Sequence, residues 1–247
     1  MAPGRRSRHN TVKAKGGFMR SFLRLLRRVL FAALVLALLA ALALTWRGYA
    51  LYREALKASS LEQTVEEVRS QPGFVAMEDL PETYLRAVVA IEDHRFYEHA
   101  GIDVIAIGRA AWHDLTTLSL EQGGSTITQQ LAKNLFLTQE KDLSRKVAEV
   151  FLAFDLEAHY DKSEILELYV NTSYFGDDCT GIGEASSRFL DKTPREMTSC
   201  ECALMAGLPN APSLLSEDME LAWRRARLVA GQMEKYGLVD SASSVCP

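Results

Sequence analysis

The sequence contains few of the patterns that mark β-structure or metal sites. No sustained alternation of apolar and polar residues runs along it, and no Asn-Gly pair offers a hairpin turn. These absences exclude a fold built mainly from strands. Its four cysteines are Cys179, Cys200, Cys202 and Cys246, and they lack the spacing of zinc ligands because Cys200 and Cys202 are one residue apart. A resident metal site is therefore not expected.

The cysteines leave two interpretations open. In an extracytoplasmic protein a bridge such as Cys179–Cys200 could form, but the sequence does not choose a connectivity. Free buried thiols are the favoured alternative, because an unpaired cysteine behaves as a small apolar residue.

Acidic residues are absent from positions 1–28, which hold nine Lys and Arg. The rest of the chain therefore carries 19 basic and 32 acidic residues, a net charge of −13. A body this acidic does not suit general nucleic-acid binding. The basic residues of the first segment need another explanation.

That explanation follows directly, since Val29–Trp46 is an uncharged apolar run of eighteen residues. Such a run is long enough to predict a membrane-spanning helix, and its basic flank should stay in the cytoplasm. Everything after Trp46 then lies outside. A cleaved signal peptide is the alternative, because Ala41-Leu42-Ala43 resembles a cleavage site. A retained anchor is favoured, since the usual secretory core has only ~7–15 residues.

Beyond the apolar run the patterns predict helices. Residues 47–70 read as a helical stem that Pro72-Gly73 ends, and Pro81 opens an amphipathic helix that ends near Asp93. We expect a mainly α protein with a basic tail (1–28), a transmembrane helix (29–46), a helical stem (47–73) and one domain over 74–247. The further helices are expected at about 103–118, 127–136, 142–160, 162–171, 181–190, 195–207 and 217–236.

The segment GGSTITQQLAKN, residues 123–134, combines glycines, hydroxyls, amides and one lysine with no acid. Ser125 and Thr126 suit the start of a helix, whose free N–H groups and positive dipole end attract anions. Gln129, Gln130 and Lys133 follow at helical spacing. The segment predicts an anion-binding site, and an ordinary capped helix with a solvated polar face is the alternative.

A second group of polar residues ends the helix expected at 81–93. Glu92 follows the apolar run AVVAI, so its carboxylate should be partly desolvated and its pKa raised. That makes Glu92 a candidate general base. The alternative is a solvated helix end in which Glu92 or Asp93 pairs with Arg95.

Two further helices carry candidate polar residues. Arg145 and Glu149 are four apart on one helix face, either as a surface pair worth ~0.3–0.5 kcal/mol or as part of a diphosphate site. Asn171, Tyr174 and Phe175 follow an apolar helix, and they could contact sugars or pack as a helix end.

Taken in order, the segments EDHRFYEHAG, GGSTITQQLAKN, RKVAEVFLAFDLE, KSEILELYVNTSYFG and ECALMAGLPNAPS resemble the successive motifs of the peptidoglycan glycosyltransferase (transglycosylase) family, glycosyltransferase family 51. The resemblance spans about residues 74–235. Since the sequence stops at Pro247, the expected type is the monofunctional one, without a penicillin-binding transpeptidase domain.

The resemblance implies a lysozyme-like helical fold with a small membrane-associated lobe. It also implies polymerisation of lipid II: the growing polyprenyl-diphosphate-linked glycan passes to the 4-hydroxyl of lipid II with inversion, which forms β-1,4 linkages and releases polyprenyl diphosphate. Glu92 and Glu149 would be catalytic, the first as the base and the second on the donor side. The substrate-binding residues would be Asp93, Arg95, Phe96, His99, Arg109, Gly124, Ser125, Thr126, Gln129, Gln130, Lys133, Asn134, Arg145, Lys146, Asn171, Tyr174, Phe175 and Gly176.

The resemblance also sets expectations for location and partners. The enzyme would be a single-pass protein of the bacterial inner membrane, with a cytoplasmic N-terminus and a periplasmic catalytic domain. Its partners would be lipid II, lipid-linked glycan, the membrane and proteins of cell-wall synthesis or division. No tightly bound cofactor is expected, although a divalent cation, Mg²⁺ or Mn²⁺, could accompany the diphosphate.

The chain departs from the family pattern in two places. It reads Arg188-Phe-Leu-Asp-Lys192 where an aromatic-Phe-Gly-Lys sequence is usual, and Ser213-Leu-Leu-Ser216 where a Tyr-Asn-Pro element often follows Pro212. Both put loop geometry in doubt more than reaction class. Two other functions compete: a lytic enzyme that cuts existing glycan, and an inactive scaffold in a cell-wall complex.

Overall fold

The computed structural model describes residues 8–117, 124–138, 142–210, 212 and 219–246. In these residues the chain is mainly helical, and two short antiparallel strands, β1 (Tyr174–Gly176) and β2 (Cys179–Thr180), form the described β-structure. The mainly α class predicted from the sequence is therefore confirmed. The chain divides into two compact units, and the boundary in the sequence lies between Arg47 and Gly48.

Helix α1 (Arg8–Ala58) contains the whole predicted membrane segment. Within it, Phe22–Ala58 is long and apolar enough to cross a membrane, and apolar side chains such as Phe31 and Leu42 are 67% exposed. A helix that is apolar all round and unburied by protein is typical of a lipid-facing span.

The stem differs from the single helix expected over residues 47–70. Helix α1 ends at Ala58, and α2 (Leu61–Arg69) begins after Ser60. The side chain of Ser60 accepts the Gln63 N–H while the Gln63 side chain accepts the Ser60 N–H. This reciprocal cap starts a new helix, so the pattern Ser-x-x-Gln was the missed boundary signal.

The helices of the second unit follow the predicted ranges closely. The expected 195–207 helix instead begins at Ser199, after a short 3₁₀ turn at Pro194 and a new cap at Thr198. Residues 118, 217 and 218 of the predicted ranges lie outside the described residues. The helices are α3 (Glu82–Glu92), α4 (Val104–Thr117), α5 (Ile127–Phe136), α6 (Leu143–His159), α7 (Lys162–Thr172), α8 (Ile182–Leu190), α9 (Ser199–Gly207), α11 (Met219–Lys235) and α12 (Ala242–Val245), with 3₁₀ turns η1 (Met77–Asp79), η2 (Phe96–Glu98) and η3 (Pro194–Glu196).

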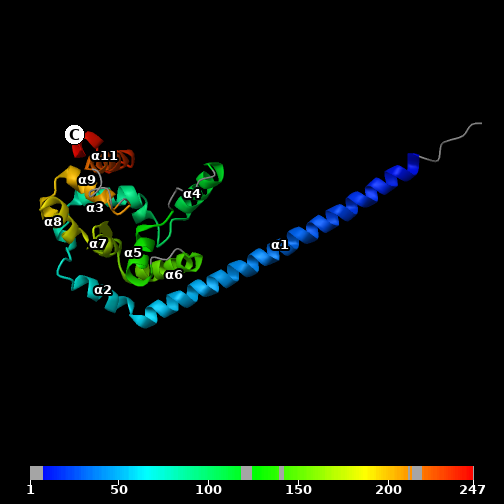
Figure 1. Ribbon diagram of the computed structural model, residues 1–247, viewed down its shortest axis with the longest axis horizontal. Coiled ribbons are helices and arrows are strands. Elements are labelled where there is room, and N and C mark those ends of the chain that lie inside the picture. The colour runs from blue at the N-terminus through cyan, green and yellow to red at the C-terminus, as the bar shows by residue number, and fades with distance from the viewer. Residues whose placement is uncertain (1–7, 118–123, 139–141, 211, 213–218, 247) are drawn as a thin grey trace, which may run out of the picture. The chain divides into compact units, whose positions relative to one another are not determined.

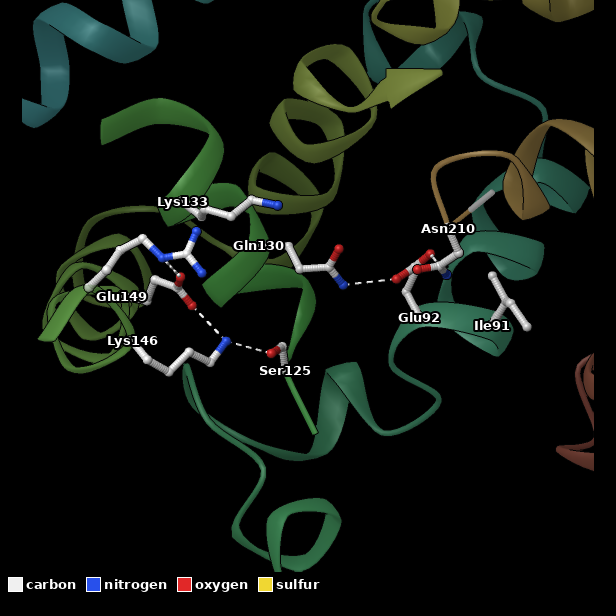
Figure 2. Close-up of a pocket in the computed structure, with 9 residues that line it drawn as sticks. Ile91, Glu92, Ser125, Gln130, Lys133, Lys146, Glu149 and Asn210 are labelled. Atoms are coloured by element: carbon white, nitrogen blue, oxygen red, sulfur yellow. Dashed lines mark hydrogen bonds and ion pairs between the residues drawn. The ribbon is translucent and has the colours of Figure 1, made fainter. Parts of the chain in front are cut away.

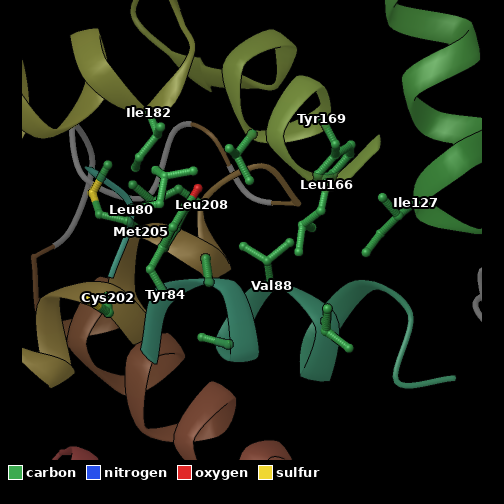
Figure 3. Close-up of a cluster of buried hydrophobic side chains, with 14 of the residues drawn as sticks. Leu80, Tyr84, Val88, Ile127, Leu166, Tyr169, Ile182, Cys202, Met205 and Leu208 are labelled. Carbon is green, nitrogen blue, oxygen red and sulfur yellow. The ribbon is translucent and has the colours of Figure 1, made fainter. Parts of the chain in front are cut away.

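Two packed groups of helices build this unit (Figure 1). Helix α3 packs against α9 and α11, while α5 packs against α6 and α7. One apolar core joins both groups, and Figure 3 shows Tyr84 and Val88 of α3 in the same cluster as Leu166 and Tyr169 of α7. Burial of such side chains contributes roughly 1.5–3 kcal/mol each, so the ends of α3, α5 and α7 are held firmly together.

The cysteines pair differently from the bridge considered in the sequence. Cys200, at the start of α9, is bonded to Cys246 after α12, with their Cα atoms 4.6 Å apart. Cys179 and Cys202 are free and buried. The Cys179–Cys200 alternative is wrong, because Cys179 is buried at strand β2 and Cys200 faces the C-terminal segment.

Candidate active site

Four segments of the second unit surround a cavity of about 410 Å³, here called the central cavity (Figure 2). The end of α3 contributes Glu92, and the loop after α9 contributes Asn210. The start of α6 contributes two cations and a carboxylate. Helix α5 contributes Gln130 and Lys133, and Ser125 lies two residues before this helix. The lining residues are Ile91, Glu92, Ser125, Gln130, Lys133, Arg145, Lys146, Glu149 and Asn210.

Glu92 lies on one wall with both carboxylate oxygens engaged by amides. Gln130 Nε2 donates to Oε2 at 2.8 Å, and Asn210 Nδ2 donates to Oε1 at 2.6 Å. Burial raises the pKa of Glu92 above its ordinary value, against the opposing effects of these two amides and of Arg225. A carboxylate with a raised pKa is a stronger base, so Glu92 is equipped to take a proton.

The opposite wall is positively charged. Glu149, only 2% exposed, accepts from Lys146 Nζ at 2.6 Å and lies 3.4 Å from Arg145 Nε. Lys146 also donates to Ser125 Oγ at 2.5 Å, and Figure 2 shows this chain of contacts facing Glu92 across the cavity. The buried carboxylate thereby fixes both cations on this wall, and Arg145 Nη1 also donates to the Thr138 carbonyl at 3.3 Å.

Lys133 adds a third cation on the same side. Burial lowers the pKa of Lys133, although Glu149 partly opposes the shift. Three cations against one carboxylate on this wall leave an excess of positive charge, which suits a multiply charged anion such as a diphosphate.

The start of α5 is fixed by Thr126. Its side chain accepts the Gln129 N–H at 3.1 Å and donates to the Gly101 carbonyl at 2.6 Å, while Gln129 accepts the Thr126 N–H. The Asp93 carboxylate accepts the Ile127 N–H at 3.2 Å. The caps therefore position Ser125 and Gln130, but the side chains of Thr126 and Gln129 are buried and do not line the central cavity.

Two further cavities adjoin the first. The second cavity, of about 560 Å³, shares Gln130 and Lys133 with it and continues past Asn134 and Tyr174. The third cavity, of about 340 Å³, shares Ile91 and Glu92 with the central one. Its other lining residues are Ala90, Asp93, His94, Ala106, Arg109, Ala110, Gln232, Lys235 and Tyr236. Arg109, which was predicted to bind substrate, lines this third cavity and not the central one.

Several residues predicted to bind substrate do not line the central cavity. Phe96 and Phe175 are fully buried in the core. Arg95 pairs with Asp103 at 3.1 Å, and His99 pairs with Asp93 at 2.9 Å. Sequence position alone did not separate them from cavity residues, because aromatic and charged side chains near a helix end serve either purpose.

The remaining predicted residues, Asn171, Gly176 and Gly124, contact neighbouring segments of the chain. Asn171 bonds both the N–H and the carbonyl of Val75, at 2.8 and 2.9 Å. Gly176 has φ +97° and lies so close to Pro212 that a side chain would collide with it. Gly124 lies beside Ile107 of α4. These three residues do not line the central cavity, whereas seven others from the prediction do: Glu92, Ser125, Gln130, Lys133, Arg145, Lys146 and Glu149.

Two contacts of the site were missed in the sequence. Asn210 bonds Glu92, and the hydroxyl of Tyr169 donates to Gln130 Oε1 at 3.2 Å. Both residues lie within motifs that the sequence analysis quoted, so the signal was present. Only the fold brings α7 and the loop after α9 to the end of α3.

The donor set of the central cavity does not fit a resident divalent cation. Glu149 is engaged by two cations and Glu92 by two amides. Across the described ranges, no group of three or more His, Cys, Asp or Glu side chains could hold a metal ion. Divalent metals prefer several free carboxylate or imidazole ligands.

Comparison with known proteins identifies relatives of this chain. A family model described as Transglycosylase matches residues 57–234. Penicillin-binding protein 1A from Vibrio cholerae is 46% identical over 164 residues, which cover 65% of this chain and 20% of that protein. Penicillin-binding protein 1F from Bacillus subtilis is 40% identical over 173 residues, which cover 69% and 24%. Penicillin-binding protein 1A from Escherichia coli is 43% identical over 167 residues, which cover 67% and 20%. The chain thus matches about a fifth to a quarter of each relative's length.

Proposed function

Because this chain belongs to the transglycosylase family, we propose that it polymerises the glycan chains of peptidoglycan from lipid II. The observation that carries the proposal is the position of Glu92, a partly buried carboxylate between the cation-lined central cavity and the third cavity. A glycosyl transfer with a diphosphate leaving group needs a base on one side and positive charge on the other.

The donor is the growing glycan on polyprenyl diphosphate, and its diphosphate occupies the central cavity. Lys133, Arg145 and Lys146 hold the phosphates with Ser125, and Glu149 orients the last two cations. As the bond from the sugar to the diphosphate breaks, negative charge develops on the leaving oxygen. Cations already fixed at that position stabilise the transition state more than the ground state.

The sugars of the donor extend into the second cavity. Its wall offers Asn134, Thr180 and the half-exposed ring of Tyr174, which suit hydroxyl groups and a sugar face. Because this cavity shares Gln130 and Lys133 with the central one, a single extended molecule can occupy both.

The acceptor lipid II occupies the third cavity. Arg109 and Lys235 supply positive charge there for the acceptor's own diphosphate. Glu92 takes the proton of the acceptor 4-hydroxyl, and that oxygen attacks the anomeric carbon from the face opposite the leaving group. A β-1,4 bond forms, the bond to the diphosphate breaks, and polyprenyl diphosphate leaves. Attack from the opposite face inverts the anomeric centre.

The proposed mechanism routes no step through a metal. A divalent cation that accompanies the diphosphate would enter as part of the substrate. Helix α1 would anchor the enzyme in the bacterial inner membrane, with the basic N-terminus inside and the second unit in the periplasm, near its lipid substrates. Partners among proteins of cell-wall synthesis or division remain a prediction.

The test is incubation of the detergent-solubilised full chain with labelled lipid II. The parent should form glycan polymer, and Glu92→Gln should lose at least about 100-fold of that activity, since a positioned base contributes roughly 10²–10⁴-fold. Glu82→Gln, at the exposed start of the same helix, is the matched control and should retain activity. A parent that forms no polymer, or instead releases fragments from intact peptidoglycan, would overturn the proposal.

A further inference from the structure

The side-chain amide of Gln130 has an oxygen, Oε1, that accepts hydrogen bonds and a nitrogen, Nε2, that donates them, and the two atoms are similar in size. Its Nε2 donates to Glu92 Oε2 at 2.8 Å. If the amide turned over, its carbonyl oxygen would face the carboxylate and repel it. The orientation of this one amide therefore decides whether Glu92 receives a donor or meets an acceptor.

The other end of the amide touches α7. The hydroxyl of Tyr169 donates to Gln130 Oε1 at 3.2 Å. Tyr169 is only 2% exposed and is packed in the core that joins α3 and α7 (Figure 3). Burial raises the pKa of Tyr169 well above its ordinary value, so the hydroxyl keeps its proton and remains a donor.

We propose that Tyr169 is a positioning residue that fixes the orientation of Gln130 and thereby keeps an N–H donor on the Glu92 carboxylate. The inference rests on the proposed function, because it concerns the base of that reaction. Tyr169, Gln130 and Glu92 form a chain that begins in the core and ends at the reacting atoms.

Glu92 also faces other charged and titratable groups, which the proposed test leaves in place. Asp93 raises the pKa of Glu92 and Arg225 of α11 lowers it, while Asn210 holds the other oxygen. Lys133 of α5 and the buried Tyr84 also interact electrostatically with Glu92. Because the substitution leaves these groups unchanged, loss of the Tyr169 hydroxyl should destabilise the ionised form of Glu92 and raise the pKa of Glu92.

The experiment compares the pH dependence of kcat for lipid II polymerisation in the parent and in Tyr169→Phe. The acidic limb should move upward by about 0.5–1 pH unit, as expected when a hydrogen bond to a charged group is weakened. Activity lost at neutral pH should return at alkaline pH. In a Gln130→Leu background, Tyr169→Phe should cause no further shift of the limb.

A merely structural role predicts a different result. Damage to packing would lower activity equally at every pH, and a lost substrate contact would raise KM without moving the limb of kcat. Tyr160→Phe, at a tyrosine that packs against the same core and whose pKa is shifted by burial, Glu62, Arg69 and Glu164 but not by Glu92, is the matched control and should leave the limb unmoved. Should Tyr169→Phe fold poorly, difluorotyrosine at position 169, a stronger donor, should move the limb downward.

The outcomes separate the two proposals. A parent that polymerises lipid II, with an unmoved limb in Tyr169→Phe or an unmoved limb with difluorotyrosine, overturns the role of Tyr169 alone. A parent without polymerisation overturns the proposed function, and the role of Tyr169 with it.

Discussion

The surroundings of Glu92 have two opposing effects on the pKa of its carboxyl group. Burial at the end of α3 disfavours its charge, while Gln130, Asn210 and Arg225 favour it. Burial is the larger effect, so the ionised form of Glu92 is less favoured in the folded protein than in the unfolded chain. A base of this kind is useful in catalysis but costs stability, as strained functional sites commonly do.

This cost predicts that Glu92→Gln stabilises the protein. The pKa of Glu92 is raised above its ordinary 4.5 in the folded state, so the unfolded chain loses this proton at lower pH than the folded one. Stability therefore falls as pH rises from 4.5 through the raised pKa. At neutral pH the variant should therefore melt at a higher temperature than the parent, by about 2–4 °C for each kcal/mol gained in a chain of this size.

The measurement is thermal unfolding at a series of pH values. The gain of Glu92→Gln over the parent should shrink as pH falls toward 4.5 and below it, where the parent carboxyl becomes protonated in both states. Glu82→Gln serves as the control without burial. A parent that becomes more stable as pH rises through this range, relative to Glu92→Gln, would contradict the sign.

Glu149 offers a second test at this scale. Glu149→Gln removes the charge that holds Lys146 at 2.6 Å and faces Arg145, so both cations should leave their positions. Misplaced binding groups cost up to about 100-fold, and we expect kcat/KM for lipid II to fall by roughly 10–100-fold. Steady-state polymerisation measures this. Glu184→Gln, at an exposed pair on α8, is the control, and equal losses in both variants would count against the role of Glu149.

Helix α5 shows how much of an element the sequence can predict. Its range, 127–136, was predicted from Ser125 and Thr126 as residues that suit a helix start, and the structure shows that Thr126 and Gln129 form a capping box there. The same rule would have found the break at Ser60, which was missed because residues 47–70 contain no internal proline to interrupt the helical pattern. Local signals fix helix ends; they do not tell which polar side chains face a cavity.

The capping box of α5 predicts a loss that combines stability and activity. Thr126→Ala removes the bond to the Gln129 N–H and the bond to the Gly101 carbonyl, and a lost cap costs about 0.5–2 kcal/mol. Since Ser125 and Gln130 flank this cap, polymerisation should also fall. Ser60→Ala removes a similar cap on α2, and Ser60 is a half-buried residue that does not line the central cavity. It should lower the melting temperature with little effect on activity; a Thr126→Ala enzyme as active as the parent would contradict this.

Across the whole molecule, side-chain placement depended on contacts between distant segments. The sequence predicted Glu92 and the cations of α6, because desolvation and charge are visible locally. It could not separate Phe96 or Asn171 from the cavity residues, nor bring Asn210 to Glu92 across 118 positions. The Cys200–Cys246 bridge likewise became visible only when α9 and the C-terminal segment were placed together.

This bridge closes a loop of 46 residues that contains α11 and the loop with Asn210. Cross-linking a loop of this length stabilises a fold by about 2–4 kcal/mol. The double variant Cys200→Ser, Cys246→Ser should therefore melt about 5–15 °C lower. Calorimetry under non-reducing conditions measures this, and addition of a thiol reductant should lower the parent toward the variant. An unchanged melting temperature in both experiments would show that the bridge does not form.

The bridge and the basic N-terminus together test the orientation in the membrane. Disulfides persist in oxidising compartments, whereas cytosolic thiols stay reduced. If the nine basic residues before the apolar run stay in the cytoplasm, the second unit lies outside and Cys200–Cys246 oxidises.

To test this orientation, living cells are quenched in acid so that thiols cannot exchange, the protein is denatured, and all its thiols are then alkylated and counted. Two free thiols are expected, Cys179 and Cys202. Replacing the basic residues by uncharged ones should weaken the orientation and produce molecules with four free thiols. Four free thiols in the parent itself would place the second unit in the cytoplasm, away from the compartment that the proposed polymerase requires.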